Sequence, residues 1–408
     1  MRVVPCLLLV LICAAAPVSR ADDWPAFRGP SGQGLCTEKN LPTTWSAKGE
    51  NVRWKVELPK SAEPWSSPVV RGDRLFLTFA ESKDPKRQWV ACYSTADGKA
   101  LWSTDVPPGP WKASAKNGYA TPAVDDGHVY AVFGSAVVAC LDLDGKLVWT
   151  RDLPSYAFDV AMAASPVLWR DLVILQCDQT GKKSNLVALD KRTGEIKYDV
   201  PRPDVGFAHG TPVLTKVGDR EQLLLMASTG MQGVDPATGK VLWQAKGSGD
   251  SSSLSALNGF AYGDSGRGNE GLAVDLTAIP AVDGDKPANI EPKWKTPKLK
   301  ESLGSPVIVG PHVYRQINDT LYCWELTTGR EVYAAQKFAG GSSRVSPVAA
   351  ADGLIYFVSG GRSFVVRAGD KFDLVATNDL DDRNDASPAV SGGRIYVRGA
   401  KFLWCIGK

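Results

Sequence analysis

The sequence predicts an all-β protein, an eight-bladed β-propeller built from four-stranded antiparallel blades. Two observations carry this prediction: a short phrase recurs along the chain, and a turn followed by an aromatic residue recurs between its copies. The composition agrees with it. The 40 glycines, 27 prolines and 13 tryptophans in 408 residues are typical of many short strands joined by tight turns.

The recurring phrase is a small residue, a proline and then usually valine or alanine, followed by a turn and a β-rich run. "ATPAVDDGHVYAV" (120–132) and "ASPAVSGGRIYVR" (386–398) are two copies. The period of about 40–55 residues leaves room for four strands in each unit. The complete copies begin at Ser67-Pro68, Thr121-Pro122, Ser165-Pro166, Thr211-Pro212, Ser305-Pro306, Ser346-Pro347 and Ser387-Pro388, and a worn copy without proline lies at Ser253–Ala256.

Each unit also carries a glycine turn followed by an aromatic residue. "DGKALW" ends at Trp102, "DGKLVW" at Trp149 and "TGKVLW" at Trp243, whereas Tyr198 and Tyr333 replace tryptophan in two other units. Glycine permits the positive φ of a tight turn. The aromatic residue is predicted to begin the outer strand and to fill the gap between neighbouring blades.

The two ends of the repeat region predict closure of the ring. The last unit, 387–408, supplies three strands and then stops. "NVRWKVEL" (51–58) reads as an isolated strand, with Trp54 in the place of the repeated aromatic residue. We therefore predict that 51–58 forms the outer strand of the eighth blade, which removes the open edge of a linear stack.

The first 21 residues read as an export signal. Arg2 precedes a short apolar run, and Ser19-Arg20-Ala21 predicts cleavage before Asp22. The run is too short to span a bilayer. A lipid anchor on Cys13 would call for a small residue at Ile12, so simple export to the periplasm or the medium is favoured, with anchoring as the alternative.

The mature chain is predicted to divide into a segment at 22–50 and the propeller at 51–408. Trp24, Phe27 and Trp45 suggest that the first segment packs on the ring. The 47 basic and 44 acidic side chains are nearly balanced, which gives no case for a nucleic-acid partner. We expect a monomer without a transmembrane segment.

Six cysteines remain after cleavage, and an even number in an exported protein suggests disulfides. The repeat register argues for free thiols instead, because cysteine alternates with alanine and glycine at one position of the units. We expect free buried thiols, with a Cys36–Cys177 bridge as the alternative. The cysteines are Cys36, Cys92, Cys140, Cys177, Cys323 and Cys405.

Two local motifs suggest other chemistry. "GDSGRGNEG" (263–271) begins like the serine loop of trypsin-type proteases, but only three histidines are present to complete a triad, so a polar loop is favoured. "DLDDRND" (379–385) is rich in carboxylates, as Ca²⁺ loops are. Its spacing matches no EF-hand, which favours a solvated loop over a cation site.

The phrase L-D-x-x-T-G-K-x-x-W, seen in "ALDKRTGEIKY" and "GVDPATGKVLW", resembles the PQQ-type propeller repeat over about residues 50–408. The leader "DWPAFRGPSGQG" (23–34) resembles exported PQQ-like proteins of planctomycete-type bacteria. One branch of this superfamily, the quinoprotein alcohol dehydrogenases, implies pyrroloquinoline quinone (PQQ) and Ca²⁺ at the ring centre, with an adjacent cysteine pair. This sequence has no adjacent cysteines.

The other branch, the BamB-like propellers, implies a scaffold in outer-membrane protein assembly without a cofactor. The size, the export signal and the lack of active-site motifs resemble this branch more, although no convincing lipid-attachment motif is present. We therefore expect a non-catalytic scaffold or ligand-binding module with a protein or peptide partner, such as an envelope protein. A PQQ-dependent oxidoreductase with PQQ and Ca²⁺ in the channel is the alternative, and carbohydrate binding is a third.

Candidate site residues come from the position three before the repeat proline, which should line the central channel. The side chains there differ widely, although a symmetric ring would favour similar ones. The aromatic and polar members could bind a planar or polar ligand by stacking and charge-assisted hydrogen bonds. The alternative is that they plug the channel, with Arg344 paired to Asp385. The candidates are Trp65, Tyr119, His209, Arg344 and Asp385.

Overall fold

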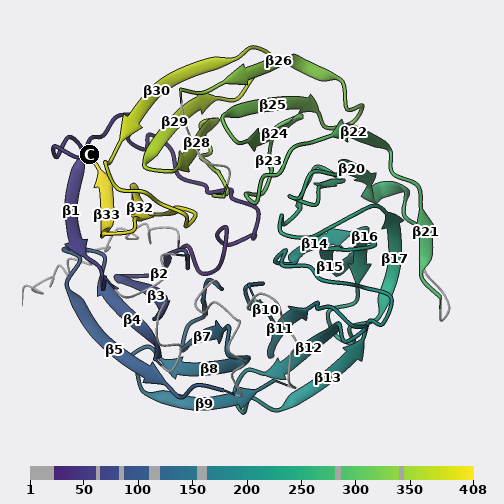
Figure 1. Ribbon diagram of the computed structural model, residues 1–408, viewed down its shortest axis with the longest axis horizontal. Coiled ribbons are helices and arrows are strands. Elements are labelled where there is room, and N and C mark those ends of the chain that lie inside the picture. Colours follow the sequence, from purple (N-terminus) through teal and green to yellow (C-terminus); the bar gives the residue numbers. More distant parts are fainter. Residues whose placement is uncertain are drawn as a thin grey trace, which may run out of the picture.

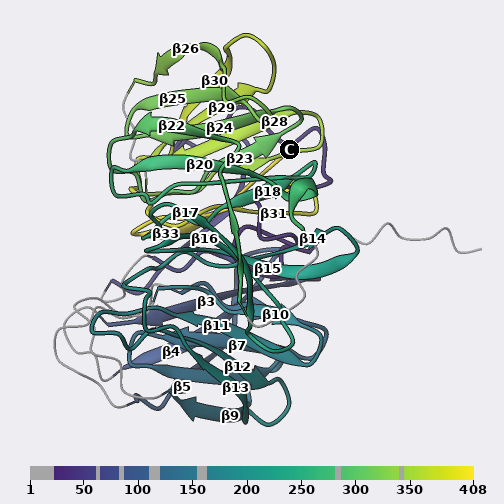
Figure 2. The same cartoon turned by 90° about the vertical axis from the view of Figure 1, so that its right-hand side faces the viewer.

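The computed structural model describes residues 23–60, 65–81, 87–109, 120–153, 163–280, 286–339 and 344–408. Eight sheets are arranged radially around a centre, which confirms the predicted eight-bladed propeller (Figure 1). Figure 2 shows the ring from its side, where the strands of neighbouring blades lie in stacked layers. The export signal predicted at 1–21 and the candidate Tyr119 lie outside the described residues.

The first four blades follow the chain from the innermost strand outward. The first blade contains β2 (Val69–Arg71), β3 (Arg74–Ala80), β4 (Gln88–Ser94) and β5 (Ala100–Val106). The second contains β6 (Ala123–Val124), β7 (His128–Phe133), β8 (Val137–Asp142) and β9 (Leu147–Asp152). The third contains β10 (Val167–Trp169), β11 (Leu172–Cys177), β12 (Asn185–Asp190) and β13 (Ile196–Pro201). The fourth contains β14 (Val213–Val217), β15 (Arg220–Ala227), β16 (Gly230–Val234) and β17 (Val241–Lys246), and β21 (Ala288–Ile290) joins it as a fifth strand.

The remaining blades include the worn copy and the closing blade. The fifth contains β18 (Ser255–Leu257), β19 (Phe260–Gly263), β20 (Glu270–Asp275) and β22 (Trp294–Lys298), with a short 3-10 helix, η1 (Leu276–Ala278), after β20. The sixth contains β23 (Val307–Val309), β24 (His312–Ile317), β25 (Thr320–Glu325) and β26 (Glu331–Lys337). The seventh contains β27 (Val348–Ala349), β28 (Leu354–Ser359), β29 (Arg362–Arg367) and β30 (Asp373–Asp379). The eighth contains β31 (Ala389–Ser391), β32 (Arg394–Arg398), β33 (Phe402–Gly407) and β1 (Val52–Glu57).

Burial along the strands follows from their place in a blade. Central strands such as β3 and β8 are buried on both faces, because each blade is sandwiched between two others, and they read as continuous apolar runs. Outer strands such as β1 and β9 alternate between half-buried and exposed side chains. Within the described residues, no helix is long and apolar enough to cross a bilayer.

Ring closure occurs as the sequence predicts. β1 pairs antiparallel with β33, so Trp54 lies opposite Cys405 and Glu57 lies opposite Phe402. The N-terminal part of the propeller therefore completes the sheet that the last residues of the chain begin (Figure 1). Closure leaves no blade interface exposed to solvent at the seam.

The repeated aromatic residues dock between blades. Trp102 donates its indole N–H to the Leu143 carbonyl oxygen of the next blade at 2.9 Å. Its ring lies against Gly145, where an added Cβ would come within 2.5 Å of the indole. The same contact is made by Trp54, Trp149, Tyr198 and Trp294 on the turns after them, which confirms the role predicted for the repeat.

Trp243 departs from this pattern. Its indole N–H bonds to Gln222 of its own blade at 2.8 Å, and its ring fills the space above Gly233, which has no side chain. In the other blades the equivalent position carries alanine or cysteine, except for Val365 in the seventh blade. The outer edge of β17 is instead paired with the parallel strand β21.

The six cysteines that the structure describes form no disulfide, so the alternative Cys36–Cys177 bridge is not formed. Five of the six are buried within blades. Burial raises the pKa of the thiols of Cys92, Cys140, Cys323 and Cys405 to about 12. These thiols stay protonated at neutral pH and act as small apolar groups.

The segment before β1 crosses the centre of the ring, where it appears as the purple trace in Figure 1. Trp24 exchanges backbone hydrogen bonds with Val70 of β2 at 2.9 and 2.8 Å. Arg28, 1 % exposed, donates to the Leu254 carbonyl oxygen of the fifth blade at 2.8 Å and to that of Pro306 in the sixth. Trp24 and Trp45 are buried in the core around the closing blade.

Candidate functional site

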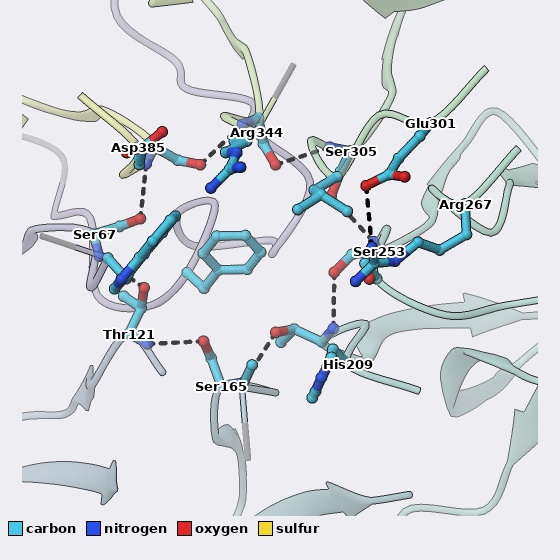
Figure 3. Close-up of a pocket in the computed structure, with 18 residues that line it drawn as sticks. Ser67, Thr121, Ser165, His209, Ser253, Arg267, Glu301, Ser305, Arg344 and Asp385 are labelled. Carbon is cyan, nitrogen blue, oxygen red and sulfur yellow. Dashed lines mark hydrogen bonds and ion pairs between the residues drawn. The ribbon is translucent and has the colours of Figure 1, made fainter. Parts of the chain in front are cut away.

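A cavity of about 340 Å³ lies at the centre of the ring. The position three before the repeat proline lines it, as the sequence predicts: Trp65, His209, Arg344 and Asp385 all border the cavity (Figure 3). Arg344 and Asp385 lie on one side and His209 on the other (Figure 3). The structure therefore brings together the four described candidates.

A closed ring of hydrogen bonds forms the wall below these side chains. In each blade, the backbone N–H of the residue before the repeat proline donates to the hydroxyl of the equivalent residue in the next blade, at 2.8–3.1 Å (Figure 3). The bond from Ser387 to Ser67 closes the circle. The members are Ser67, Thr121, Ser165, Thr211, Ser253, Ser305, Ser346 and Ser387.

This ring explains why the small residue of the repeat is always serine or threonine. The worn copy keeps Ser253 although its proline is replaced by Leu254, because the hydroxyl carries the contact between blades. The signal was present in the sequence as the absence of alanine and glycine from all eight copies. Each hydroxyl accepts from a buried amide, which fixes the geometry of the wall.

Arg344 lies over the ring of Trp65, with the guanidinium carbon 5.4 Å from the ring centroid. This distance is within the range of a cation–π contact. The pairing of Arg344 with Asp385 that the sequence suggested is not formed. Asp385 instead makes an ion pair with Arg383 at 2.9 Å.

Asp385 keeps one carboxylate oxygen without a partner. The residue is 8 % exposed, and its Oδ1 atom is buried without a hydrogen bond. Leaving such an acceptor unsatisfied costs about 1–3 kcal/mol. An unpaired oxygen in the lining is therefore a place where a donor group of a ligand would gain a hydrogen bond.

His209 is held in its neutral form. Burial, and then the positive charge of Arg267, lower the pKa of the imidazole to about 4. The ring meets Phe207 edge-on with centroids 4.1 Å apart. At neutral pH this side chain therefore offers an uncharged donor and acceptor to the cavity.

Besides the hydroxyl residues of the wall, the sequence alone missed four lining residues: Phe27, Ser251, Arg267 and Glu301. Phe27 comes from the N-terminal segment, and Ser251 holds the equivalent position in the worn copy. Arg267 pairs with Glu301 at 3.0 Å and contacts Asp250 at 3.5 Å. A search for the phrase without its proline would have found Ser251, whereas the other three break the repeat.

The protease-like loop is structural. Asp264 accepts two hydrogen bonds from Arg315, at 2.7 and 2.9 Å, and both side chains are buried. The backbone carbonyl of Ser265 accepts the Ser251 N–H at 2.9 Å. The motif therefore holds the worn blade together beside the cavity.

The acidic stretch 379–385 also serves the fold. Asp382 accepts the backbone N–H groups of Lys401 and Phe402 and the indole N–H of Trp404, each at 3.0 Å. Across the part of the chain that the structure describes, no three histidine, cysteine or carboxylate side chains gather as a metal site. Within these described residues the lining therefore offers Trp65 and Arg344 to a planar anion and contains no such cluster of metal ligands.

The fold and this cavity define a closed propeller with a central cavity. The chain belongs to the family described as outer membrane protein assembly factor BamB, whose model matches residues 86–335. No curated protein sequence matches the chain significantly.

Solved structures share the fold at low sequence identity. BamB from Moraxella catarrhalis is 16 % identical with a TM-score of 0.61, over 86 % of this chain and 95 % of that chain. A europium-containing methanol dehydrogenase is 11 % identical with a TM-score of 0.67, over 92 % and 89 %. A quinohemoprotein alcohol dehydrogenase from Pseudomonas putida is 11 % identical with a TM-score of 0.57, over 92 % and 75 %.

Proposed function

We propose that this protein is an exported, non-catalytic propeller that binds a protein partner, with the central cavity as a recognition site. Membership of the BamB family supports a role in an assembly of proteins. The predicted export signal at 1–21 supports a periplasmic or secreted location.

The observation that carries the proposal is the variety of side chains at symmetry-equivalent positions around one cavity. Trp65, Arg344 and Asp385 supply a flat apolar face, a cation and an unpaired carboxylate oxygen. His209 is neutral, and the hydroxyls of the wall already accept hydrogen bonds from the next blade. These groups suit hydrogen bonding and stacking of a bound side chain.

Affinity capture tests the proposal with matched variants. The tagged mature protein is incubated with envelope extract from its own cells, beside Arg344→Ala/Asp385→Asn and the control Arg330→Ala, an exposed arginine in an outer turn. We expect one partner on the wild type and the control, and about tenfold less on the cavity variant. Equal capture by all three would rule out the cavity, and no partner on any would contradict the scaffold role.

The quinone-dependent oxidoreductase remains a second candidate, because Trp65 and Arg344 together suit a planar anion. Purified protein is titrated with PQQ and Ca²⁺ while absorbance and melting temperature are followed. Under the proposed function neither changes at micromolar cofactor. A rise in melting temperature that Trp65→Ala abolishes would favour the oxidoreductase instead.

A further inference from the structure

The second residue after the repeat proline, on the innermost strand of each blade, differs between blades in how far its side chain is exposed. The second residue after the repeat proline is 0–2 % exposed in six blades, at Val70, Val124, Ala256, Ile308, Ala349 and Val390. In the third and fourth blades this residue is leucine, Leu168 and Leu214, and both leucines remain partly exposed. Large apolar side chains are thus less covered here than smaller ones elsewhere.

The N-terminal segment covers the equivalent position in four blades through hydrogen bonds. The backbone N–H groups of Val70, Val124 and Ala349 donate to the carbonyl oxygens of Trp24, Pro25 and Gly34 at 2.7–2.8 Å. The N–H of Ala256 donates to the side-chain oxygen of Gln33. The segment therefore adds to the inner edges of these blades much as a further strand would.

The inner edges of the third and fourth blades have the same register. Val70 lies opposite Leu75 and Leu168 opposite Val173, each one pair from the closing pair of its hairpin. Leu214 lies opposite Leu223, three pairs from the closing pair Val217–Arg220, and so holds the same place in the alternation. Because N–H groups alternate in direction along an antiparallel ladder, the amides of Leu168 and Leu214 point away from their own sheets, as that of Val70 does. They face outward at an edge that the N-terminal segment does not bond.

A second cavity, of about 330 Å³, lies against these two edges. Its lining is mostly apolar and is completed by the N-terminal segment, with Phe27 and Thr211 shared with the central cavity. The third and fourth blades line it with Val167, Leu168 and Leu214, together with the repeat prolines Pro166 and Pro212.

The charged groups at this cavity are already paired with one another. Arg71 contacts Asp23 at 2.6 Å and also Asp126, and Lys191 contacts Asp125 at 3.4 Å. An occupant therefore gains little from carrying charge. The partly exposed side chains of Leu168 and Leu214 favour an apolar occupant.

We propose that this cavity is a docking groove for an extended, uncharged, apolar peptide segment of a partner protein. The segment pairs its backbone with Leu168 and Leu214 and continues around the ring the interface that the N-terminal segment makes with Val70 and Val124. The inference rests on the proposed role as a binding module and identifies the chemistry of the partner.

Hydrogen–deuterium exchange tests the free edges without any partner. In the isolated mature protein, the amides of Leu168 and Leu214 exchange at least about tenfold faster than those of Val70 and Ala349. Slow exchange at both leucines would overturn the groove and leave the scaffold role untouched, so the two failures are distinguishable.

Peptide binding tests the occupant. The probe is a capped, fluorescein-labelled peptide of about nine residues, the length of a long strand, in which valine and threonine alternate. Its affinity is measured for the wild type, Leu168→Asp, Leu214→Asp and the control Leu374→Asp, a leucine 42 % exposed on the outer strand β30. We expect both groove variants to bind about tenfold more weakly, and the control to bind as the wild type does.

A matched probe, N-methylated at every second residue along one edge, separates backbone pairing from apolar contact. It keeps the side chains and should bind about tenfold more weakly than the parent peptide when the paired edge is methylated. No binding of the parent peptide at micromolar concentration, equal binding by all variants, or equal binding of the methylated probes would each overturn the proposal. So would a concentration-dependent dimer that Leu168→Asp abolishes, because the occupant would then be a second copy.

Discussion

The indole of Trp102 lies in van der Waals contact with Gly145 of the following blade, and the contact depends on two properties of that glycine. Gly145 has a φ of +88°, and its missing Cβ leaves the space that the indole fills. Both properties recur at the turns that receive Trp54 and Trp149. A side chain added at any of these glycines would therefore displace the indole that docks there.

Gly145→Ala should be more destabilising than Gly72→Ala. Gly72 also has a positive φ, +58°, but an added Cβ there meets nothing within 4 Å. We expect Gly72→Ala to cost about 1–2 kcal/mol for the left-handed backbone, and Gly145→Ala about 1–3 kcal/mol more because the indole must move. Urea unfolding of the two variants measures the difference. Equal midpoints would contradict the docking role of Trp102.

His209 should make stability depend on pH. The unfolded chain protonates its histidines near the ordinary pKa of about 6.5, whereas burial lowers the folded pKa of His209 to about 4. The unfolded state therefore binds more protons between these values, and stability falls as the pH drops from about 6.5 toward about 4.

The comparison of the wild type with His209→Gln isolates this effect. Asp178, whose pKa burial raises to about 6, acts in the opposite direction over the same range but is common to both proteins. Between pH 7 and pH 5 the urea midpoint of the wild type should fall further than that of His209→Gln. Parallel curves would show that His209 is solvated in the folded protein.

At the scale of the elements, the hydroxyl ring joins the innermost strands of all eight blades. Seven of the eight bonds link residues 41–54 positions apart, and the eighth, from Ser387 to Ser67, links residues 320 positions apart, so none forms within a single blade. The phrase that the repeat analysis treated as a proline signal is therefore equally a hydroxyl signal. Its physical role became evident only when neighbouring blades were in place.

Ser165→Ala should leave the Thr121 amide without its acceptor and cost about 1–3 kcal/mol. Ser165→Thr should be close to neutral, because threonine fills the same role at Thr121 and Thr211. Thermal unfolding measures stability, and hydrogen exchange at Thr121 reports the local effect. If both variants had the same melting temperature and exchange rate as the wild type, the hydroxyl hydrogen bonds would not contribute to stability.

The elements that the sequence predicted well share a local code. The strands, their order and the docking aromatic residues follow from a period and a turn that each unit carries. An assignment made for one unit therefore applies to the others. Trp243 was wrongly placed between blades because its behaviour depends on Gly233, one strand away, which leaves room for the indole in its own blade.

For the whole molecule, two truncated chains separate the contribution of ring closure through β1 from that of the N-terminal segment that covers the inner strands. A chain starting at Asn51 keeps β1 and lacks the segment, whereas a chain starting at Lys60 lacks both. We expect the first to remain a monomer of reduced stability. The second should expose the edge of β33 and aggregate.

Size-exclusion chromatography and thermal unfolding distinguish the two truncated chains. The shorter chain should lose its single cooperative transition, because the eighth blade then has three strands. If the shorter chain stayed monomeric and as stable as the longer one, pairing of β1 with β33 would not be needed for the stability of the ring.

The sequence by itself determined the number of blades, their register and the seam at β1, because these are properties that repeat along the chain. It also pointed to one set of positions at the centre, since symmetry carries one position to all blades. Only the tertiary structure decided which lining groups stay unpaired, as at Asp385, and how the N-terminal segment crosses the ring. Those features depend on single contacts between distant residues, such as Arg28 with Leu254 across 226 positions, and no period in the sequence encodes such a contact.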